Sequence, residues 1–223
     1  MARPKAWMSW SSGKDSAWAL HTLRSKGEVE IVGLLTSINR TAGRVAMHAV
    51  REQLLEVQAT ALGLPLVKVL LPSPCSNEQY ESAMSKALTL ATAQGITVIA
   101  FGDLFLEDVR RYREEKLAET GIKPIFPLWS AGTSQLARDM VGAGLRAHVT
   151  CIDPKQLAPS FAGRTYDGHF LDCLPSDVDP CGERGEFHTF AYEGPMFDRP
   201  IPVVPGRVLE RDGFVFADLM LRD

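Results

Sequence analysis

The chain has 223 residues, a length that suits one large domain or one domain with a smaller appendage, and 45% of the residues are hydrophobic. A formal net charge of −3 at pH 7 argues against the basic surface of a nucleic-acid-binding protein. No run reaches the ~18 apolar residues of a membrane-spanning helix, the N-terminus does not resemble a signal peptide, and the four cysteines include no C-x-x-C pair. We therefore expect a cytoplasmic protein with reduced thiols.

Short apolar runs and helix-like stretches alternate over the first two thirds of the chain. The runs that we expect to form strands are KAWMSW (5–10), VEIVGLL (29–35), LVKVLL (66–71), ITVIAF (96–101) and LRAHVTC (145–151). Such runs suit strands that are buried on both faces. Apolar residues at helical spacing predict helices over 47–62 and 77–94. This alternation predicts an α/β fold, with a Rossmann-like parallel sheet and helices on both of its faces.

The sequence changes in character after about residue 152. A turn-rich stretch, LDCLPSDVDPCGERGEFHTF, is followed by RVLERDGFVFADLML, which is typical of a hairpin that turns at Asp212-Gly213. We therefore divide the chain into a larger domain, residues 1–151, and a smaller β-containing C-terminal lobe, residues 152–223.

The loop SSGKDS follows the first apolar run and precedes a helix-like stretch. It is not a Walker A loop, since Met8 stands five positions before Gly13 and Asp15 follows the lysine. Small residues nevertheless let a backbone approach an anion at a helix N-terminus, where unpaired N–H groups and partial positive charge gather. The residues that we expect to bind phosphate are Ser11, Ser12, Gly13, Lys14, Asp15 and Ser16. A carboxylate beside phosphate indicates a divalent metal between them, so we expect Asp15 to bind Mg²⁺; a serine-capped turn is the alternative.

This loop is similar to the SGGKDS loop of the PP-loop ATP pyrophosphatases, a HUP-type superfamily (adenine nucleotide alpha hydrolase-like), with Ser12 where the motif has glycine. Within that superfamily, four further stretches resemble the diphthine–ammonia ligase group. They are MHAVREQLLEVQATALGLPL (47–66), PCSNEQYE (74–81), FGDLFLEDVRRYREEKLAETGIKPIFPLW (101–129) and DPCGERGEFHTF (179–190). The similarity runs from about residue 5 to residue 197.

The resemblance implies a ligase that uses ATP to form an amide. In that group, ATP adenylates a substrate carboxylate, and ammonia then displaces AMP. The known acceptor is the diphthine side chain of the translocating elongation factor, so this factor is an expected partner, besides ATP, ammonia and Mg²⁺. Lys14 and Asp15 are then expected to be catalytic, because adenylation needs stabilisation of the α-phosphate and a metal on the pyrophosphate.

Polar residues that follow the fourth predicted strand are also candidates for the site. Because ligands bind beyond the carboxyl ends of parallel strands, we expect Gly102 and Asp103 at the nucleotide, with Asp103 catalytic. A helix cap is the alternative role of Asp103. Arg110 and Arg113 share a predicted helix face, and with Glu114 they are expected to contact pyrophosphate or substrate; a solvated charged face is the alternative.

The stretch CGERGEFH (181–188) is the best candidate for substrate recognition. Its glycines allow the backbone to approach a ligand closely. The residues that we expect to bind substrate there are Gly182, Glu183, Glu186 and His188, and both glutamates are expected to be catalytic. Their carboxylates suit ammonium capture or removal of a proton from the attacking amine. A glycine-rich turn with exposed acidic residues is the alternative.

The sequence leaves the role of some residues, and the choice of reaction, open. His48 is expected to reach the nucleotide or the substrate, although a structural histidine is the commoner case. A zinc set of His169, Cys173, Cys181 and His188 lacks the compact ligand pairs of structural zinc sites. A tRNA-modifying enzyme, a ligase for another carboxylate and a non-catalytic nucleotide-sensing module would each fit the loop SSGKDS. A homodimer is also compatible with the sequence.

Overall fold

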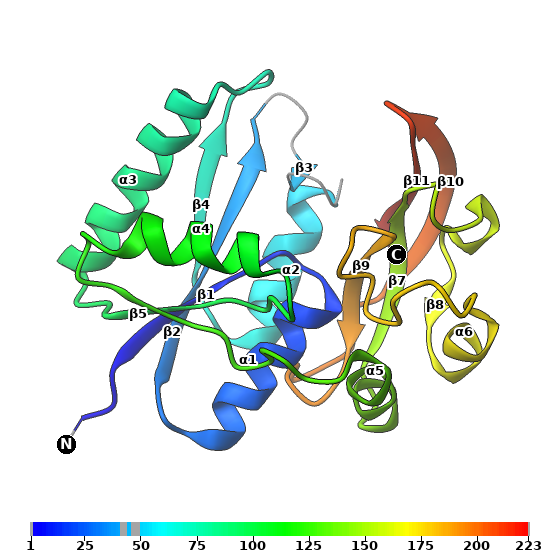
Figure 1. Cartoon of the computed structure of the whole chain (residues 1–223), viewed down its shortest axis with the longest axis horizontal. Helices are drawn as coiled ribbons and strands as arrows, with labels where there is room; N and C mark the ends of the chain where they lie inside the picture. The colour runs from blue at the N-terminus through cyan, green and yellow to red at the C-terminus, as the bar shows by residue number, and fades with distance from the viewer. Residues whose placement is uncertain (1, 41–43, 46–49, 223) are drawn as a thin grey trace.

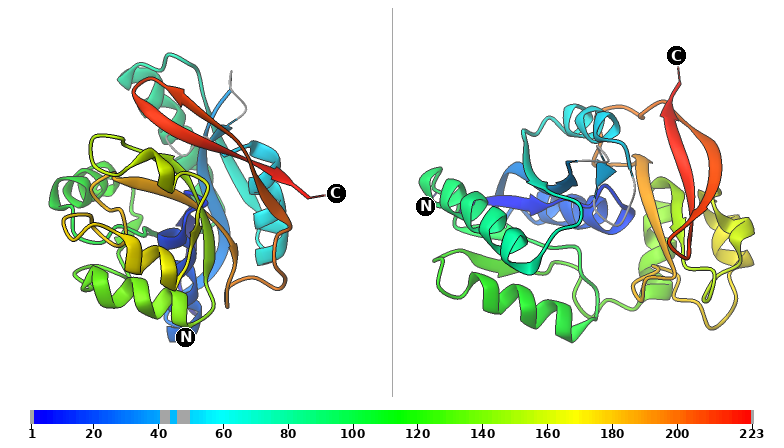
Figure 2. Two further views of the ribbon diagram at one scale, coloured as in Figure 1. Left: turned by 90° about the vertical axis from the view of Figure 1, so that its right-hand side faces the viewer. Right: turned by 90° about the horizontal axis from the view of Figure 1, so that it is seen from above.

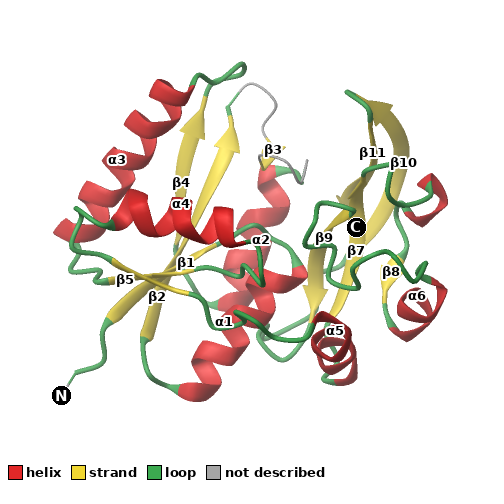
Figure 3. Cartoon of the chain, in the orientation of Figure 1, coloured by secondary structure: helices red, strands yellow, loops and turns green. Residues whose placement is uncertain are grey.

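The computed structural model describes residues 2–40, 44–45 and 50–222, so the expected site residue His48 lies outside the described residues. Two separate β-sheets with flanking helices make up the molecule, as Figure 3 shows. Among the helices of the described residues, none combines the length and the apolar character needed to cross a membrane.

The first sheet has five parallel strands in the order β4-β2-β1-β5-β6, which confirms the predicted Rossmann-like α/β fold (Figure 1). Its strands are β1 (Lys5–Ser9), β2 (Glu30–Asn39), β4 (Leu66–Leu71), β5 (Val98–Ala100) and β6 (Lys123–Ile125), and the short β3 (Arg44–Val45) pairs antiparallel with the end of β2. Four of the five parallel strands are predicted runs. The fifth, β6, has three residues and a central proline, so no apolar run marks it.

Helices cover both faces of this sheet because its strands are apolar on both sides. Along β1, Met8 belongs to one hydrophobic core and Trp7 to the other, and Leu34 and Leu35 alternate in the same way along β2. The helices are α1 (Lys14–Lys26) and α2 (Glu52–Leu62) on the first face, and α3 (Asn77–Ala93) and α4 (Glu107–Leu117) on the second (Figure 2).

Local signals in the sequence set the ends of these helices. Ser76 Oγ accepts the N–H of Gln79, and the Gln79 side chain accepts the N–H of Ser76, so a capping box starts α3. Gly27 and Gly63 end α1 and α2, each with a left-handed φ of 65°.

The second sheet is antiparallel and is built around β7 (Arg146–Ile152), which pairs with β8, β9 and β11. The other elements of this region are α5 (Thr133–Gly142), η1 (Pro159–Phe161), β8 (Thr165–Tyr166), α6 (Gly168–Cys173), β9 (Phe187–Glu193), β10 (Val203–Arg211) and β11 (Phe214–Leu221). The predicted hairpin is β10–β11, and its turn residues Asp212 and Gly213 have φ values of 54° and 80°.

One strand was predicted in the wrong sheet. The run 145–151, which we expected in the parallel sheet, is β7, the central strand of the antiparallel sheet. Every residue from Ala147 to Ile152 is buried, so the run has the continuous apolar character of a strand in a doubly covered parallel sheet. The change from parallel to antiparallel structure therefore falls between β6 and β7, before the expected boundary at residue 151.

The two sheets share one hydrophobic core. Leu20 of α1 belongs to the same cluster of buried side chains as Phe190 of β9. Gln58 of α2 is fully buried, and its amide donates to the carbonyl oxygens of Ser12 and Ala191 at 3.0 and 2.6 Å. The loop after β1 is therefore held from both sides, by α2 and by the second sheet.

Candidate active site

The loop between β1 and α1 lies in a tight space, where a glycine of the loop and a glycine after β5 are both close to neighbouring backbone. Gly13 is the N-cap residue of α1, and a Cβ on it would lie 3.3 Å from the carbonyl oxygen of Thr189. A Cβ on Gly102, after β5, would lie 2.9 Å from the backbone nitrogen of Ser16. The backbones of three segments thus converge at the N-terminus of α1, where partial positive charge attracts anions.

Ser12 carries strain that a glycine would avoid. Its φ is 72°, in the left-handed region. Its carbonyl oxygen accepts the N–H of Ala191 at 2.9 Å, so β9 holds the loop in this conformation. Within the described part of the chain, its buried hydroxyl makes no hydrogen bond. Serine therefore occupies the glycine position of the PP-loop motif with a polar atom left for a ligand.

Lys14 points into the junction between the two sheets. Its side chain is 2% exposed, and its Nζ donates to Asp15 Oδ2 at 2.8 Å and to the carbonyl oxygen of Cys181. The ring centres of Tyr166 and Phe187 lie 5.4 and 5.2 Å from Nζ. Burial is the largest single influence on the pKa of Lys14 and lowers it, but Asp15 together with the other acidic groups nearby, Cys181 and Glu183, raises the pKa above its ordinary value, so the side chain stays an ammonium group.

A cavity of 1150 Å³ lies between α3 and α4 above the first sheet. Ser11, Thr36 and Phe101 line it at the carboxyl ends of β1, β2 and β5, and Tyr80 and Arg113 line it from the helices. The strand order reverses between β1 and β5, which is where open α/β sheets bind their ligands. Thr36 Oγ1 is buried and has no partner within the described residues, so it can serve a ligand in this cavity.

Arg113 holds Asp103 in place. Its Nε and Nη2 donate to the two carboxylate oxygens of Asp103 at 2.5 and 3.1 Å, and its guanidinium lies 4.4 Å from the ring centre of Phe101. The N-cap residue of α4 is Leu106, so Asp103 is not the cap of this helix. Because Arg113 also lines the cavity, the ion pair connects the cavity to the loop after β5.

Arg110 and Glu114 of α4 have contacts other than Asp103. They form an ion pair at 2.8 Å, and the Arg110 guanidinium packs 4.7 Å from the ring centre of Trp129 and 5.0 Å from that of Phe126. Among the described residues that line the cavity, Arg113 is present, whereas Arg110 and Glu114 are not. Of the two arginines, Arg113 is the one that lines the cavity, and the expected contact of both with pyrophosphate or substrate stays a prediction.

The segment 179–186, here called the acidic loop, is shaped by its own carboxylates. Glu186 is 2% exposed and accepts the N–H of Asp179 at 3.0 Å and the N–H of Arg184 at 2.9 Å. Asp179 Oδ2 in turn accepts the N–H of Glu183 at 2.9 Å. These bonds fix the loop backbone, so Glu186 positions Glu183 from the inside of the fold.

Glu183 is the carboxylate of the acidic loop that contacts the first sheet. Its Oε1 accepts the N–H of Leu104 at 2.7 Å, directly after Asp103. Burial raises the pKa of Glu183 to about 7, and the nearby negative charges of Asp15 and Asp103 add to the increase. A carboxyl group that titrates near neutral pH is suited to act as a general base or acid.

His188 in β9 is neutral in the folded chain. Burial, and to a smaller extent the positive charge of Lys14, lower its pKa to about 4. Its register partner in the second sheet is Cys151 of β7. A neutral imidazole offers one donor and one acceptor, so His188 can orient a polar substrate group but cannot supply a positive charge to it.

The structure brings most of the predicted site residues to the junction of the two sheets. They are Ser11, Ser12, Gly13, Lys14, Asp15, Ser16, Gly102, Asp103, Arg113, Gly182, Glu183, Glu186 and His188. Three further residues were not predicted: Thr36, which lines the cavity, and Tyr166 and Thr189, which contact Lys14 at the junction. Thr189 Oγ1 accepts the N–H of Lys14 at 3.1 Å, and only its place inside FHTF hinted at the site.

Comparison with protein families divides the chain at the same junction. Residues 4–124 match the diphthamide synthase N-terminal domain, and residues 132–216 match the diphthamide synthase C-terminal domain. The chain belongs to the diphthamide synthase family. This confirms the resemblance found in the sequence motifs.

Curated relatives in this family are similar to nearly the whole chain. The diphthine–ammonia ligase of Homo sapiens is 22% identical over 229 residues, which cover 93% of this chain and 85% of the relative. That of Mus musculus is 24% identical over 237 residues with the same coverage. That of Danio rerio is 24% identical over 213 residues, covering 86% of this chain and 83% of the relative.

The candidate active site lies where the two diphthamide synthase segments meet. Lys14, Asp15 and Asp103 belong to the N-terminal match, whereas Glu183 and His188 belong to the C-terminal match. The contacts of Lys14 with Cys181 and of Glu183 with Leu104 cross this division. Both segments are therefore needed to complete the site.

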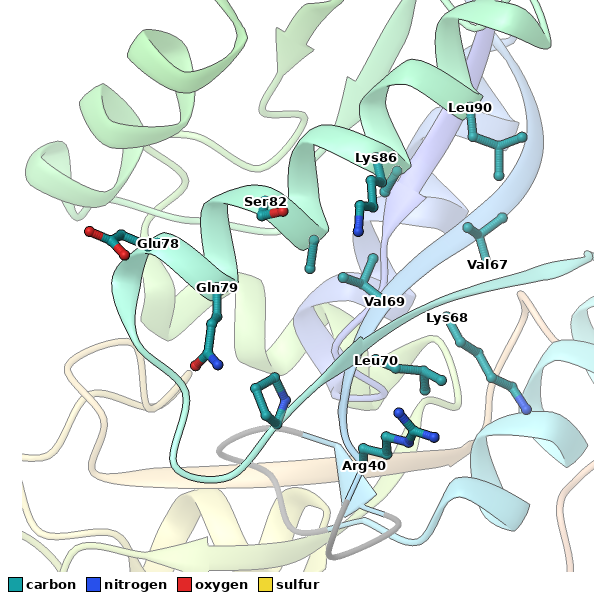
Figure 4. Close-up of a pocket in the computed structure, with 13 residues that line it drawn as sticks. Arg40, Val67, Lys68, Val69, Leu70, Glu78, Gln79, Ser82, Lys86 and Leu90 are labelled. Carbon is teal, nitrogen blue, oxygen red and sulfur yellow. The ribbon is translucent and has the colours of Figure 1, made fainter.

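A second cavity, of 750 Å³, lies at the outer edge of the first sheet between β4 and α3 (Figure 4). Val67 and Leu70 line it from β4, and Ser82 and Lys86 line it from α3. Within the described part of the chain, it contains none of the predicted site residues. The cavity above β1 is thus the one that adjoins residues 11–16, because Ser11 lines it.

Proposed function

We propose that this member of the diphthamide synthase family is an ATP-dependent ligase that adenylates a carboxylate and transfers ammonia to it, forming an amide. The observation that carries the proposal is the contact between two loops: residues 11–16, at the N-terminus of α1, and the acidic loop with Glu183. The first suits the phosphates of ATP, and the second supplies a carboxyl group with a pKa of about 7. The names of the relatives support the same reaction.

The adenosine of ATP is expected in the cavity above β1, with the phosphates at the N-terminus of α1. Thr36 Oγ1 is available in the cavity, and Ser12 Oγ is available in the loop. The first backbone N–H groups of the helix and its partial positive charge favour the phosphates. Lys14 adds a full positive charge at the start of the same helix.

The expected Mg²⁺ fits beside Asp15. Its Oδ1 is buried and lacks a partner among the described residues, and carboxylate oxygen is a preferred ligand of this ion. The described residues contain no cluster of three or more metal-binding side chains, which suits an ion held by one carboxylate and by the phosphates of ATP. Bound there, Mg²⁺ would neutralise charge on the departing pyrophosphate.

The two chemical steps use the two loops in turn. In the first step, an oxygen of the acceptor carboxylate attacks the α-phosphorus, and the bond to pyrophosphate breaks. In the second step, the nitrogen of ammonia attacks the acyl carbon, and the bond between that carbon and the oxygen of AMP breaks. Glu183 takes the proton that ammonium must lose before its nitrogen can attack.

The acceptor that we propose is the diphthine side chain of the translocating elongation factor. The support for it is the diphthine–ammonia ligase name that the relatives carry. The homodimer expected from the sequence stays a prediction, which light scattering of the purified chain would test.

Analysis of the nucleotide products tests the proposed function. The chain is incubated with ATP, Mg²⁺, NH₄Cl and diphthine-bearing elongation factor, and the nucleotides and the intact factor are analysed by chromatography and mass spectrometry. We expect AMP, pyrophosphate and a factor whose diphthine has become the amide. The same mixture without the factor is the control for unproductive ATP cleavage. Formation of ADP and phosphate would refute the adenylation mechanism.

A further inference from the structure

The ammonium group of Lys14 occupies an enclosed position away from the nucleotide cavity. Among the described residues, Lys14 does not line that cavity, and its side chain is 2% exposed. Its Nζ has two hydrogen-bond acceptors, Asp15 Oδ2 and the carbonyl oxygen of Cys181. Binding of the phosphates of ATP by Lys14 does not require these acceptors, so the enclosed position calls for another explanation.

Four groups surround this position, and we call them the ammonium cage: the Asp15 carboxylate, the Cys181 carbonyl and the rings of Tyr166 and Phe187. A protonated nitrogen is stabilised by each of them, through charge-assisted hydrogen bonds or through the negative faces of the rings. Tyr166 also donates its O–H to the carbonyl oxygen of Pro180 at 2.9 Å, which fixes the backbone next to Cys181. This hydrogen bond of Tyr166 does not involve Lys14, so it can hold the ring in place when the lysine side chain moves.

We propose that the cage is the binding site for ammonium, the nitrogen donor of the reaction, and that Lys14 fills it only until ATP binds. The inference rests on the proposed function. A free ammonium ion carries the same charge as the lysine head group and presents N–H donors in the same way, so the same four groups can hold it. Because Lys14 starts α1, where the phosphates are expected, ATP draws its ammonium group out of the cage.

The proposed base belongs to the same loop as the carbonyl group of the cage. Glu183 follows Cys181 by two positions, and the charges of Asp15 and Lys14 are close enough to change its pKa. Ammonium transfers one proton to Glu183, and the remaining ammonia forms the bond to the acyl carbon while the bond to AMP breaks. The second proton, lost as the neutral amide forms, leaves with the phosphate of AMP. ATP therefore binds before ammonium.

Thermal unfolding of Lys14→Ala tests the cage without any turnover. This variant removes the occupant and leaves the four surrounding groups in place. We expect NH₄Cl at about 0.1 M to raise its Tm by about 2–4 °C above the value in equal KCl, because a ligand that binds only the folded chain stabilises it. The wild-type chain, whose own lysine fills the cage, shows no difference between the two salts.

Equal Tm values of Lys14→Ala in NH₄Cl and KCl would overturn the proposal, since K⁺ is close to ammonium in size but has no N–H donors. Lys26→Ala is the matched control, because Lys26 is an exposed lysine in the last turn of the same helix, and it is expected to behave as the wild type. Tetramethylammonium is too large for the cage and has no N–H donors. A stabilisation by this ion equal to that by ammonium would also overturn the proposal.

Steady-state kinetics of the full reaction give a second test. Phe187→Leu removes one aromatic wall, and we expect the KM for ammonium to rise about tenfold while the KM for ATP changes less than about twofold. Tyr166→Phe keeps the ring and removes only the O–H, so it is the matched control, with an expected rise in the KM for ammonium below about threefold. An equal rise of both KM values in Phe187→Leu would overturn the proposal.

The two tests separate this inference from the proposed function. A wild-type chain that forms no AMP with any acceptor would refute the ligase reaction, whereas the Tm of Lys14→Ala would still report whether the cage binds ammonium. A wild-type chain that forms AMP and amide, together with a Lys14→Ala variant that does not respond to ammonium, would refute the cage alone.

Discussion

The nucleotide loop, residues 11–16, and the acidic loop, residues 179–186, lie against each other at the junction of the two sheets, yet they use their polar groups in different ways. In the nucleotide loop, Ser12 Oγ and Asp15 Oδ1 are buried without a hydrogen-bond partner among the described residues. In the acidic loop, both carboxylate oxygens of Glu186 accept backbone N–H groups of the same loop.

The nucleotide loop thus has buried polar atoms that a ligand could satisfy, whereas the polar atoms of the acidic loop stabilise the conformation of that loop. A buried polar atom without a partner costs roughly 1–3 kcal/mol, and a ligand that satisfies it recovers that cost on binding. Internal hydrogen bonds instead fix the backbone of the acidic loop, and Glu183, the proposed base, accepts the N–H of Leu104 in the first sheet's domain. Substitutions in the nucleotide loop should therefore lower the reaction rate. Substitutions in the acidic loop should lower the free energy of unfolding and also displace Glu183.

The largest expected effect is that of Lys14→Ala on the reaction. We expect the rate of AMP formation to fall by about 10³-fold, because a full positive charge at the phosphates is lost. Initial rates at saturating ATP and acceptor would measure it. Lys26→Ala is the control for loss of a lysine from α1 and should keep the wild-type rate. A rate in Lys14→Ala within about tenfold of the wild type would show that the charge acts elsewhere.

Glu183→Gln should have the next largest effect, a decrease of about 10²–10³-fold in amide formation with ATP binding unchanged. The wild-type activity should increase as the pH rises through about 7, because the carboxyl group of Glu183 is an effective base only when ionised. The activity of Glu183→Gln should lack this increase and should change with pH only through the ionisation of ammonium to ammonia. Parallel pH profiles of the two proteins would contradict the role of Glu183 as base.

Glu186→Ala tests the acidic loop as a scaffold. It leaves the N–H groups of Asp179 and Arg184 without their acceptor, so the free energy of unfolding should fall by about 2–3 kcal/mol. Turnover should fall as well, since Glu183 loses its fixed position, while ATP binding is spared. Urea unfolding and nucleotide binding would measure the two effects. Glu186→Gln retains one acceptor oxygen and should lose less stability; equal losses would argue against the hydrogen bonds as the cause.

The smallest expected effect is that of Ser12→Gly, which restores the glycine of the PP-loop motif. We expect the free energy of unfolding to rise by about 0.5–1 kcal/mol, as relief of the left-handed strain at φ 72° exceeds the added entropy of glycine in the unfolded chain. Ser12→Ala removes the hydroxyl but keeps the strain, so it separates the two causes. A less stable Ser12→Gly would mean that the Ser12 hydroxyl contributes to the folded state.

The residues of the candidate site were predictable to different degrees. Lys14 and Asp15 stand in a short motif whose geometry follows from one turn and one helix, so local sequence was enough to nominate them. Arg110 and Arg113 share a spacing but not a partner, because Arg110 packs on Trp129 whereas Arg113 pairs with Asp103. Which charged side chain reaches a ligand depends on the segments that pack beside the helix, and those are distant in the sequence.

The fold shows the same limit. The hairpin at Asp212-Gly213 was predictable because its turn needs two residues with positive φ, a local requirement. The run 145–151 was predicted in the wrong sheet, since an apolar run can be buried in either sheet. The strand β6 was not predicted, because three residues with a central proline have too little pattern to recognise.

By itself, the sequence determined the parallel α/β sheet, the phosphate-type loop at the start of α1, the family and the list of acidic candidates, because these follow from periodicity and from motifs of a few consecutive residues. Only the tertiary structure decided what each acidic residue does. Glu183 and Glu186 are three positions apart in one glycine-rich stretch, but one contacts the first sheet and the other its own loop. The physical reason is that burial, charge and hydrogen-bond partners come from chain segments that folding alone brings together.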